Sequence, residues 1–522
     1  MDTLLHRFGS LIKGCIEGFD RIIFKGSLRP IAYAVGMQSY LRSKGILNKD
    51  FKGWAMEKSA IIVEAAEQYT QRECGKDIIY IPSINTRKEG LAHKSQKESG
   101  IENGLIGAWS CVEGCKTYKS TFNHAAQYPI LQPINSRCKH LYFYYDHQDY
   151  GFMSVRLQTW APYGIQIAVN GREWLRRSLE KAECGYVIDG NKFLHIDDYG
   201  LAQQLLDKQR ETNWEQLLTG FAKEAFPSMQ DMFGENMGYY WTVWQSEVAR
   251  DYIFKDPQSF EPLADRIVRH AIMAGKYENV LRYLDHPVKK DGQPYRNANI
   301  DLLSKVNTWG DGMRVRHYVD GNSVKVYNQH NVLRFETTVN NPGKYKIHRL
   351  PQNAGESDGK KFLPMRKGIA DINVRATISS ERNSAFVEQL ATVSDKTPFA
   401  ETIKDVTRPV AGINKKKVRA LNITGKDREL LRAVSDPAFN AGSITNKALQ
   451  KALVGTDWAN GMTDKKLSAK ISRQLSLLRS HGIIKKLPKQ HRYMLTDKGR
   501  KITLALNAML SASTEDFVNA TA

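Results

Sequence analysis

The order of secondary-structure patterns near the C-terminus constrains the fold of this chain more than any other feature. Within residues 421–510, three helical stretches precede a strand, a basic turn, a second strand and a final helix. In the third helical stretch, Leu467, Ile471, Leu475 and Leu478 recur at three- and four-residue spacing, which predicts one buried face. Ser, Thr and Asp residues stand where the helices begin, and their side-chain oxygens can cap free backbone N–H groups.

This order of elements resembles the winged helix-turn-helix domains of MarR-like bacterial regulators. The segment RYMLTDKGRK is similar to the junction between the wing and the last helix of those domains. The resemblance implies that the third helix enters the major groove of duplex DNA and that the wing reaches the neighbouring backbone or minor groove. Binding of structured RNA, or of a protein, is the alternative for a domain of this kind.

The residues expected to contact nucleic acid are mainly basic side chains outside the buried stripe. Residues 401–510 carry 23 basic and 8 acidic side chains, so a large part of the positive charge lies here. The lysines of the linker can equally form a solvated hinge. The expected contacts are Lys466, Lys470, Arg473 and Gln474 on the third helix, Lys489, His491 and Arg492 in the wing, and Lys415, Lys416 and Lys417 in the linker.

Basic residues outnumber acidic ones over the whole chain, 76 against 55, and the formal net charge is +21. This excess favours DNA and/or structured RNA as the partner over a merely solubilising surface. No run of about 18 apolar residues occurs, so a membrane partner is not expected. Six cysteines are too few for a disulfide scaffold and predict a reducing, cytoplasmic location. The oligomeric state is left open.

The remaining patterns predict an α+β multidomain protein. Strand and helix patterns alternate in the first part of the chain, which predicts a mixed α/β sheet. The segment YYWTVWQSEVARDYIF (239–254) has apolar residues at helical spacing and is expected to be a helix. The expected divisions are a mixed α/β domain (1–205), a helical region (206–300), an antiparallel β-meander region (301–395), a basic linker (396–420) and the winged helix-turn-helix (421–522).

Three acidic residues are candidates for catalysis. Asp20 lies inside an apolar strand pattern, Asp146 ends another, and Glu247 lies on the expected helix 239–254. A buried carboxylate is unfavourable without a partner, and carboxylates that converge can hold two Mg²⁺ ions for phosphoryl transfer. Their order resembles the acidic triad of ribonuclease-H-like nucleases and transposases. We therefore expect the three to lie about 4–7 Å apart, with structural salt bridges to arginines as the alternative.

Cysteines and one histidine form a candidate zinc site. Cys111 and Cys115 precede Cys138 and His140, and three thiolates with one imidazole suit tetrahedral Zn²⁺. The spacings differ from the usual pair of cysteines separated by two residues. The alternative is that the cysteines pack as small apolar residues.

Two further segments have two interpretations each. Tyr239, Tyr240, Trp241 and Trp244 can stack on single-stranded bases if they are exposed, or can be core residues. The segment 323–340 is distantly similar to rolling-circle replication initiators, which implies roles for Lys325, Tyr327, Arg334 and Glu336. The paired-histidine motif of those initiators is missing, and cross-strand charge pairs on a solvated sheet are the alternative.

Over most of its length the chain resembles an uncharacterised bacterial protein family, through segments such as FDRIIFKGSLR, VNGREWL and RFETTVNNP. This resemblance implies a bacterial origin and a mobile-element setting. GxxxxGK[ST] and HExxH are absent, which excludes the enzyme classes that depend on them. The leading hypothesis is a DNA-processing or mobile-element protein, with metal-dependent nuclease or transposase-like activity. A non-enzymatic transcriptional regulator or RNA-binding protein is the alternative.

Overall fold

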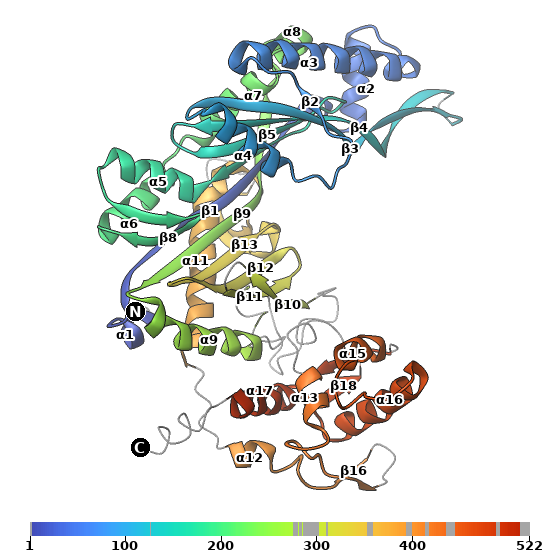
Figure 1. Ribbon diagram of the computed structural model, residues 1–522. Coiled ribbons are helices and arrows are strands. Elements are labelled where there is room, and N and C mark those ends of the chain that lie inside the picture. Colours follow the sequence, from blue (N-terminus) through green and yellow to red (C-terminus); the bar gives the residue numbers. More distant parts are fainter. Residues whose placement is uncertain are drawn as a thin grey trace. The chain divides into compact units, whose positions relative to one another are not determined.

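The computed structural model shows a mixed α/β protein (Figure 1). The chain divides into two compact units. Unit 1 comprises Met1–Cys15, Asp251–Thr337 and Glu381–Ala522, and unit 2 comprises Ile16–Arg250 and Thr338–Ser380. The structure describes residues 3–125, 127–274, 280, 284, 302–309, 312–351, 359–392, 399–412, 417–434, 444–486 and 491–511.

A large mixed sheet forms the centre of unit 2. Its strand order is β9-β1-β6-β5-β4-β3-β2. The pairs from β1 to β3 are antiparallel, whereas β2 pairs in parallel with β3. The strands are β1 (Ile12–Leu28), β2 (Ile79–Tyr80), β3 (Gly104–Asn123), β4 (Tyr128–His147), β5 (Gly151–Gln158), β6 (Ile165–Asn170) and β9 (Tyr239–Phe254), of which residues 16–28 of β1 and 239–250 of β9 belong to this unit.

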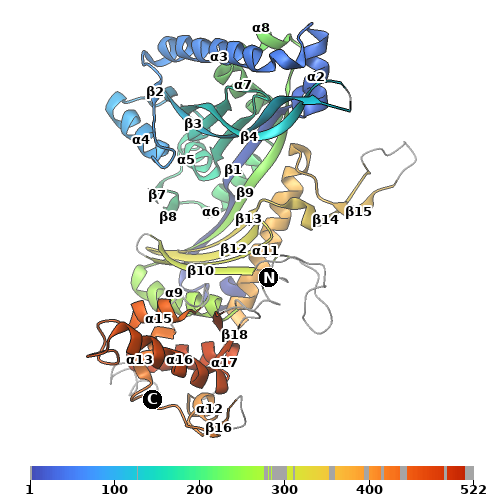
Figure 2. The same cartoon turned by 90° about the vertical axis from the view of Figure 1, so that its right-hand side faces the viewer.

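Helices cover one face of this sheet (Figures 1 and 2). Phe24, Leu141 and Phe143 of the strands share a hydrophobic core with Trp54 and Trp214 of the helices. The other face is covered in part by α4, whose Ala92 packs with Ile106 and Trp109 of β3, and in part by α5 and the β7–β8 turn, which line a pocket with Asp20. The helices and short strands are η1 (Arg29–Ile31), α2 (Ala34–Ser43), η2 (Asn48–Asp50), α3 (Phe51–Cys74), α4 (Lys88–Ser99), α5 (Gly171–Lys181), β7 (Tyr186–Asp189), β8 (Lys192–Ile196), α6 (Tyr199–Gln209), α7 (Trp214–Ala225) and α8 (Met229–Phe233).

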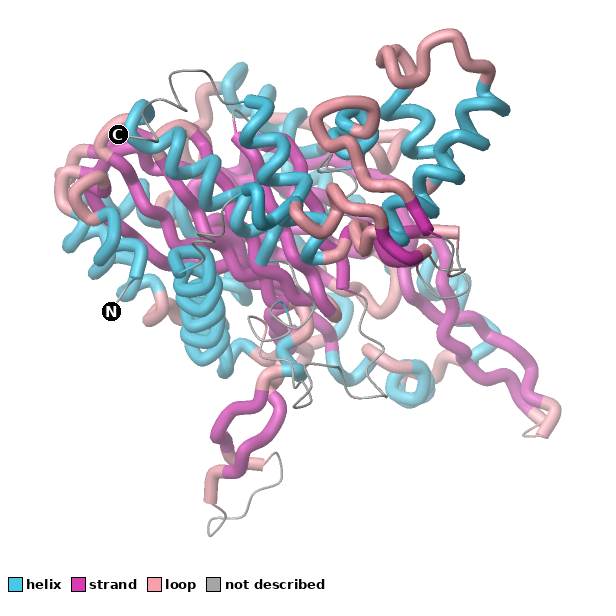
Figure 3. The backbone as a smooth tube through the Cα atoms, turned by 90° about the horizontal axis from the view of Figure 1, so that it is seen from below, coloured by secondary structure: helices cyan, strands magenta, loops and turns pink. Residues whose placement is uncertain are grey.

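Two hairpins extend from unit 2 as arms (Figure 3). β3 and β4 pair over their whole length, and each has 20 residues. The second arm is formed by β14 (Lys346–Arg349) and β15 (Lys361–Pro364), with η3 (Pro342–Lys344) before it and η4 (Ile369–Asp371) after it. The following helix α11 (Ile372–Thr392) continues into unit 1 at residue 381.

Unit 1 contains an antiparallel meander. Its strands lie in the order β10-β11-β12-β13, and residues 320 and 330 adopt the left-handed conformation in its turns. Val315, Val324 and Phe335 of the meander form a core with Leu263 of α9. The elements are α1 (Thr3–Phe8), α9 (Pro257–Ala274), β10 (Leu302–Trp309), β11 (Gly312–Val319), β12 (Asn322–Gln329) and β13 (Val332–Val339).

The C-terminal elements of unit 1 have a hydrophobic core of their own, which contains Leu431, Leu449, Ile471 and Leu506. Asn446 connects two of the helices, because its amide donates to the Ser468 carbonyl at 2.9 Å and to the Ser472 hydroxyl at 2.8 Å. The elements are α12 (Phe399–Ile403), β16 (Val410–Ala411), β17 (Lys417–Val418), α13 (Arg428–Val434), α15 (Asn446–Leu453), α16 (Asp464–Ser480), β18 (Ile484–Lys486), β19 (Tyr493–Leu495) and α17 (Asp497–Ser511).

One prediction about the fold is wrong. Residues 239–254 form β9, not a helix, so Glu247 lies on a strand. Trp241 and Val243 are buried while Tyr240 and Trp244 are exposed, which is the two-residue alternation of a strand. Aromatic and β-branched side chains favour strands over helices, and this preference outweighs the accidental helical spacing. The expected helical region therefore contains a strand of the central sheet.

Candidate functional site

Asp20 and Glu247 line one pocket of unit 2, named here the carboxylate pocket. It has a volume of about 480 Å³ and also contains Glu89 and His93 of α4 and Asn191 of the β7–β8 turn. A carboxylate oxygen of Asp20 lies within 4.8 Å of one of Glu247. Two carboxylates at this distance repel each other, and a cation between them relieves the repulsion. The two residues come from β1 and β9, which are neighbours in the sheet.

Asp20 is held by two side chains from distant parts of unit 2. The amide of Asn191 donates a hydrogen bond to Asp20 Oδ1, and Arg172 Nε lies 3.8 Å from the same oxygen. Arg172 is fully buried, and it also donates to the Ala249 carbonyl at 2.8 Å. A buried guanidinium therefore compensates part of the charge of Asp20.

The start of α5 brings Arg172 to this position. The side chain of Asn170 accepts hydrogen bonds from the backbone N–H groups of Arg172 and Glu173, at 2.9 and 3.3 Å, and so caps the helix. A Cβ atom at Gly171 would lie 2.1 Å from the Phe19 carbonyl oxygen, so only glycine fits here. The segment VNGREWL carries this cap, and sequence reasoning did not identify Arg172 or Asn191 as partners of Asp20.

Glu247 is half-buried on β9. Gln245 Nε2 donates a hydrogen bond of 2.9 Å to Glu247 Oε1, which orients one oxygen of the carboxylate. Carboxylate oxygens are the protein ligands that Mg²⁺ prefers, and one or two carboxylates with several waters are typical of its sites. Asp20 and Glu247 together can therefore hold a divalent cation.

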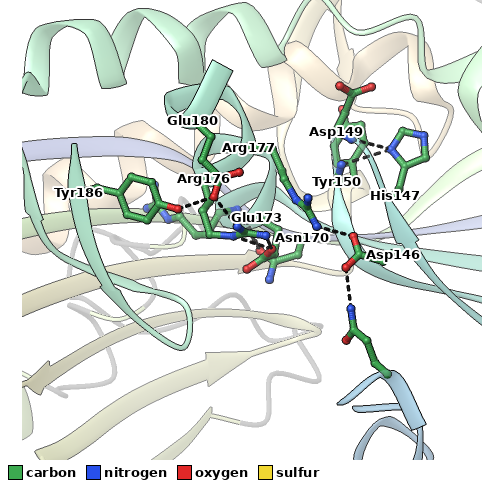
Figure 4. Close-up of polar contacts among 12 residues, drawn as sticks. Asp146, His147, Asp149, Tyr150, Asn170, Glu173, Arg176, Arg177, Glu180 and Tyr186 are labelled. Atoms are coloured by element: carbon green, nitrogen blue, oxygen red, sulfur yellow. Dashed lines mark hydrogen bonds and ion pairs between the residues drawn. The ribbon is translucent and has the colours of Figure 1, made fainter. Parts of the chain in front are cut away.

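Asp146 does not belong to this pocket. It lies at the end of β4, where Arg177 Nη2 donates to Oδ1 at 2.5 Å and Gln96 Nε2 donates to Oδ2 at 2.6 Å (Figure 4). It lines a separate pocket of about 590 Å³ with His147 and Gln216. Burial raises the pKa of Asp146, although the charge of Arg177 acts in the opposite direction. The structure brings Asp20 and Glu247 together and gives Asp146 a salt bridge instead.

The four residues of the candidate zinc site lie on β3 and β4. Cys111 is directly opposite His140 in the strand pairing, but it packs in an apolar cluster with Trp109 and Tyr144. Three donor atoms of this set do not lie within 4.8 Å of one another, as judged on these four described residues. All four are buried, and zinc binding stays a prediction.

A hydrogen bond links the Cys115 and Cys138 thiols and shifts their pKa values in opposite directions. It raises the pKa of Cys138, which burial raises further, and it lowers the pKa of Cys115. Cys138 Sγ also lies 3.9 Å from His140 Nδ1. Burial lowers the pKa of His140 to about 4, so its imidazole is neutral at pH 7. A neutral imidazole and an acidified thiol are suitable metal donors.

Helix α16 has the two faces that the sequence predicts. On the side away from the core, Lys466 and Arg473 are exposed, and so are the small residues Ala469 and Ser476 at the same helical spacing. A small side chain therefore separates the two cations, a detail that the sequence analysis did not single out. Two of the expected contacts, Lys470 and Gln474, are half-buried. The buried stripe consists of Leu467, Ile471, Leu475 and Leu478.

Lys470 has a local partner. Its ammonium donates to the Trp458 carbonyl at 2.7 Å and lies 3.7 Å from the centre of the Trp458 ring. Burial lowers the pKa of Lys470. Lys470 is therefore less available to a phosphate than Lys466 or Arg473.

The other expected contacts are described only in part. His491, Arg492 and Lys417 are exposed, whereas Lys415, Lys416 and Lys489 lie outside the described residues. Next to Lys417, Arg419 is bound to Asp427 by two hydrogen bonds of 2.7 Å.

The buried polar residues of the meander form internal pairs. Lys325 Nζ donates to Glu336 Oε1, and the Tyr327 hydroxyl donates to Glu336 Oε2 at 2.9 Å. Arg334 pairs with Asp251 at 2.9 Å between Nη2 and Oδ2. The cross-strand charge pair between Lys325 and Glu336 is confirmed, but these residues are buried, so the expected solvated sheet is wrong.

Comparison with protein-family models, with curated proteins and with solved structures gives no match for this chain. The function is therefore argued from the residues alone. No helix in the described ranges combines the length and the apolar character that crossing a bilayer requires.

Proposed function

We propose that the chain is a nucleic-acid-binding protein and that residues 421–511 form a winged helix that docks α16 on duplex DNA or structured RNA. The observation that carries the proposal is the division of α16 into a fully buried stripe and an opposite stripe with Lys466 and Arg473 exposed. The element order, with the hairpin of β18 and β19 between α16 and α17, supports the same interpretation. The proposed setting is a mobile element, with a transcriptional regulator as the alternative.

Equilibrium binding of the full chain to a labelled duplex, measured at several salt concentrations, tests this proposal. We expect the Lys466→Ala/Arg473→Ala variant to bind more weakly and to lower the slope of log K against log salt by about 1.8, which corresponds to two phosphate contacts. The exposed lysine Lys52 of α3 offers a control, since Lys52→Ala leaves α16 intact. An unchanged slope in the double variant would exclude α16 as the contact helix.

A second proposed function is metal-dependent phosphoryl transfer at the carboxylate pocket. It is favoured by the separation of less than 4.8 Å between the Asp20 and Glu247 carboxylates. Here Asp20 and Glu247 hold Mg²⁺, while Asn191 and Arg172 orient Asp20. When bound, the cation would polarise a phosphate oxygen.

Incubation of the full chain with labelled DNA and RNA, with Mg²⁺, Mn²⁺ or chelator, tests the second function. We expect metal-dependent cleavage or joining that Asp20→Asn and Glu247→Gln each reduce by at least about a hundredfold, a loss typical of groups that act in the transition state. Glu67→Gln is the matched control, because Glu67 is an exposed carboxylate on α3. Tight binding without any product would leave the non-enzymatic regulator as the better interpretation.

A further inference from the structure

Two exposed aromatic side chains on β9 each carry a cation on the ring. Trp244 is 46% exposed and Tyr240 is 39% exposed. Lys25 Nζ lies 3.3 Å from the centre of the Trp244 ring, and the Arg29 guanidinium lies 3.3 Å from the centre of the Tyr240 ring. Lys367 lies 5.7 Å from the Trp244 ring. These five residues are named here the stacking face.

The backbone of unit 2 holds the stacking face in place. The Thr242 hydroxyl, between the two aromatic residues, donates to the Lys25 carbonyl at 3.1 Å. Thr242 also forms a β-bridge with Gly368, and Val243 N–H donates to the Lys367 carbonyl at 2.8 Å. The aromatic rings therefore stand on a sheet instead of a loop, so little conformational entropy is lost when a ligand stacks on them.

The charges around the stacking face favour an anionic partner. Burial lowers the pKa of Lys25, and the nearby charges of Arg156, Lys367 and Lys116 lower it further. Arg156 is neutralised in part by Glu113, at 3.0 Å, whereas Lys116, Arg29 and Lys367 are exposed. Crowded cations repel one another, and phosphate groups relieve that repulsion.

We infer that the stacking face binds single-stranded nucleic acid, with bases on Trp244 and Tyr240 and phosphates at Lys25, Arg29 and Lys367. Cation-rich grooves with exposed aromatic rings are the usual means of holding single strands, because every base has a flat π-face. An acidic protein would use the cations but not the pair of exposed rings. This inference goes beyond the proposed duplex contact, since it uses other residues in the other unit.

The position of the stacking face adds a reason for this partner. Lys25 and Trp244 lie on β1 and β9, the same strands that carry Asp20 and Glu247. Lys25 is five residues from Asp20, which is about 16 Å along a strand. A single strand bound to the rings can therefore extend along the sheet to the carboxylate pocket.

The test uses the full chain and a fluorescent oligothymidylate of about 16 nucleotides, the upper end of the site size of known single-strand modules. Its affinity is compared with that for a duplex of equal length. We expect Tyr240→Ala/Trp244→Ala to weaken oligothymidylate binding at least about tenfold and to leave the duplex affinity within about twofold. The reason is that stacking of a base on one ring contributes a factor of about ten to the affinity. Tyr80→Ala is the control, because Tyr80 is a 55% exposed tyrosine on β2.

A second variant keeps the test decisive if the double aromatic variant does not fold. Lys25→Gln/Lys367→Gln should lower the salt slope for oligothymidylate by about 1.4, the value for two single-strand phosphate contacts. Unchanged oligothymidylate binding in a folded aromatic variant would overturn the inference. It would also be overturned if the lysine variant weakened polyglutamate binding as strongly as oligothymidylate binding. If Lys466→Ala/Arg473→Ala did not affect duplex binding, only the proposed role of the winged helix would be contradicted, and the inference about the stacking face would be unaffected.

Discussion

Helix α16 and the stacking face are both basic, but their cations are placed differently. On α16, Lys466 and Arg473 stand apart on an exposed stripe with the small side chain of Ala469 between them. On the stacking face, Lys25 and Arg29 lie directly on exposed aromatic rings. Separated cations on a helix match the regularly spaced phosphates and base edges of a duplex groove. Cations beside aromatic rings suit single-stranded nucleic acid, because its unpaired bases can stack on the rings while its phosphates contact the cations.

The difference follows from the geometry of the two elements. On a helix, residues three and four positions apart are neighbours on one face, and between Lys466 and Arg473 those positions carry the small Ala469 and the half-buried Lys470. A sheet places residues of neighbouring strands side by side, and β1 therefore supplies Lys25 to a ring of β9. Positive charge alone does not distinguish the two surfaces, whereas the neighbours of each cation do.

The largest effect that we expect outside the binding assays is a loss of stability at the carboxylate pocket. Arg172→Met leaves the buried Asp20 carboxylate without its guanidinium and should lower the free energy of unfolding by about 3–5 kcal/mol. If the pocket holds a cation, Mg²⁺ should restore part of this loss, because binding to the folded state stabilises it. Denaturant unfolding with Mg²⁺ or chelator measures both effects.

Arg177→Met is the matched control, since it removes the arginine from Asp146 in the other pocket. We expect Mg²⁺ to restore stability to the Arg172 variant and not to the Arg177 variant. If Mg²⁺ restored the stability of both variants equally, or of neither, the proposal that Asp20 binds a cation and Asp146 does not would be contradicted.

A smaller effect is expected for Glu113, which forms ion pairs with Lys88 at 2.9 Å and with Arg156 at 3.0 Å. Burial alone would raise the pKa of Glu113, but hydrogen bonds from Tyr142 and Lys88 and the charge of Arg156 lower it to about 2. A depressed carboxyl pKa stabilises the fold above the unfolded value near 4.5, and this contribution is lost as the pH falls towards 2. Glu113→Gln should therefore cost about 1–2 kcal/mol at pH 7, after allowance for solvent screening.

Glu113→Gln also tests whether the stacking face and α16 bind nucleic acid independently. It frees Arg156, whose charge acts on Lys25 of the stacking face, so we expect oligothymidylate affinity to rise about threefold while duplex affinity stays constant. The difference in stability from the wild type, followed by thermal unfolding, should disappear near pH 2. A stability difference that does not depend on pH would show that Glu113 acts through packing and not through its charge.

The smallest expected effect lies on α16 itself. Lys470→Ala should change the salt slope for duplex binding by less than about 0.3, whereas Lys466→Ala should lower it by about 0.9. The reason is that the Lys470 ammonium is bound to the Trp458 carbonyl at 2.7 Å. Equal effects of the two substitutions in a salt titration would mean that Lys470 leaves Trp458 when the duplex binds.

Elements with regular patterns were predictable from the sequence. β5 and β6 alternate strictly between buried and half-buried residues, and α16 has its apolar stripe at helical spacing. In β9 the spacing of Trp241, Trp244 and Val248 is that of one helix face, but in the strand Trp241 and Val248 are buried and Trp244 is exposed, so the spacing was misleading.

The contacts of the candidate site depend on strand order and not on local pattern. Asp20 and Glu247 are neighbours only because β1 and β9 pair, and Asn191 reaches Asp20 from 171 positions away. Asp20 itself was predictable, since a carboxylate inside an apolar strand needs a partner. The identity of that partner, Arg172, requires the position of α5, which its local sequence does not specify.

The most direct test of two separate nucleic-acid surfaces measures four affinities under the same salt conditions. Lys466→Ala/Arg473→Ala and Tyr240→Ala/Trp244→Ala, each in the full chain, are titrated with the duplex and with oligothymidylate. We expect the first variant to lose only duplex affinity and the second to lose only oligothymidylate affinity. If both variants lose both affinities equally, one shared surface binds nucleic acid, and the separation proposed here is contradicted.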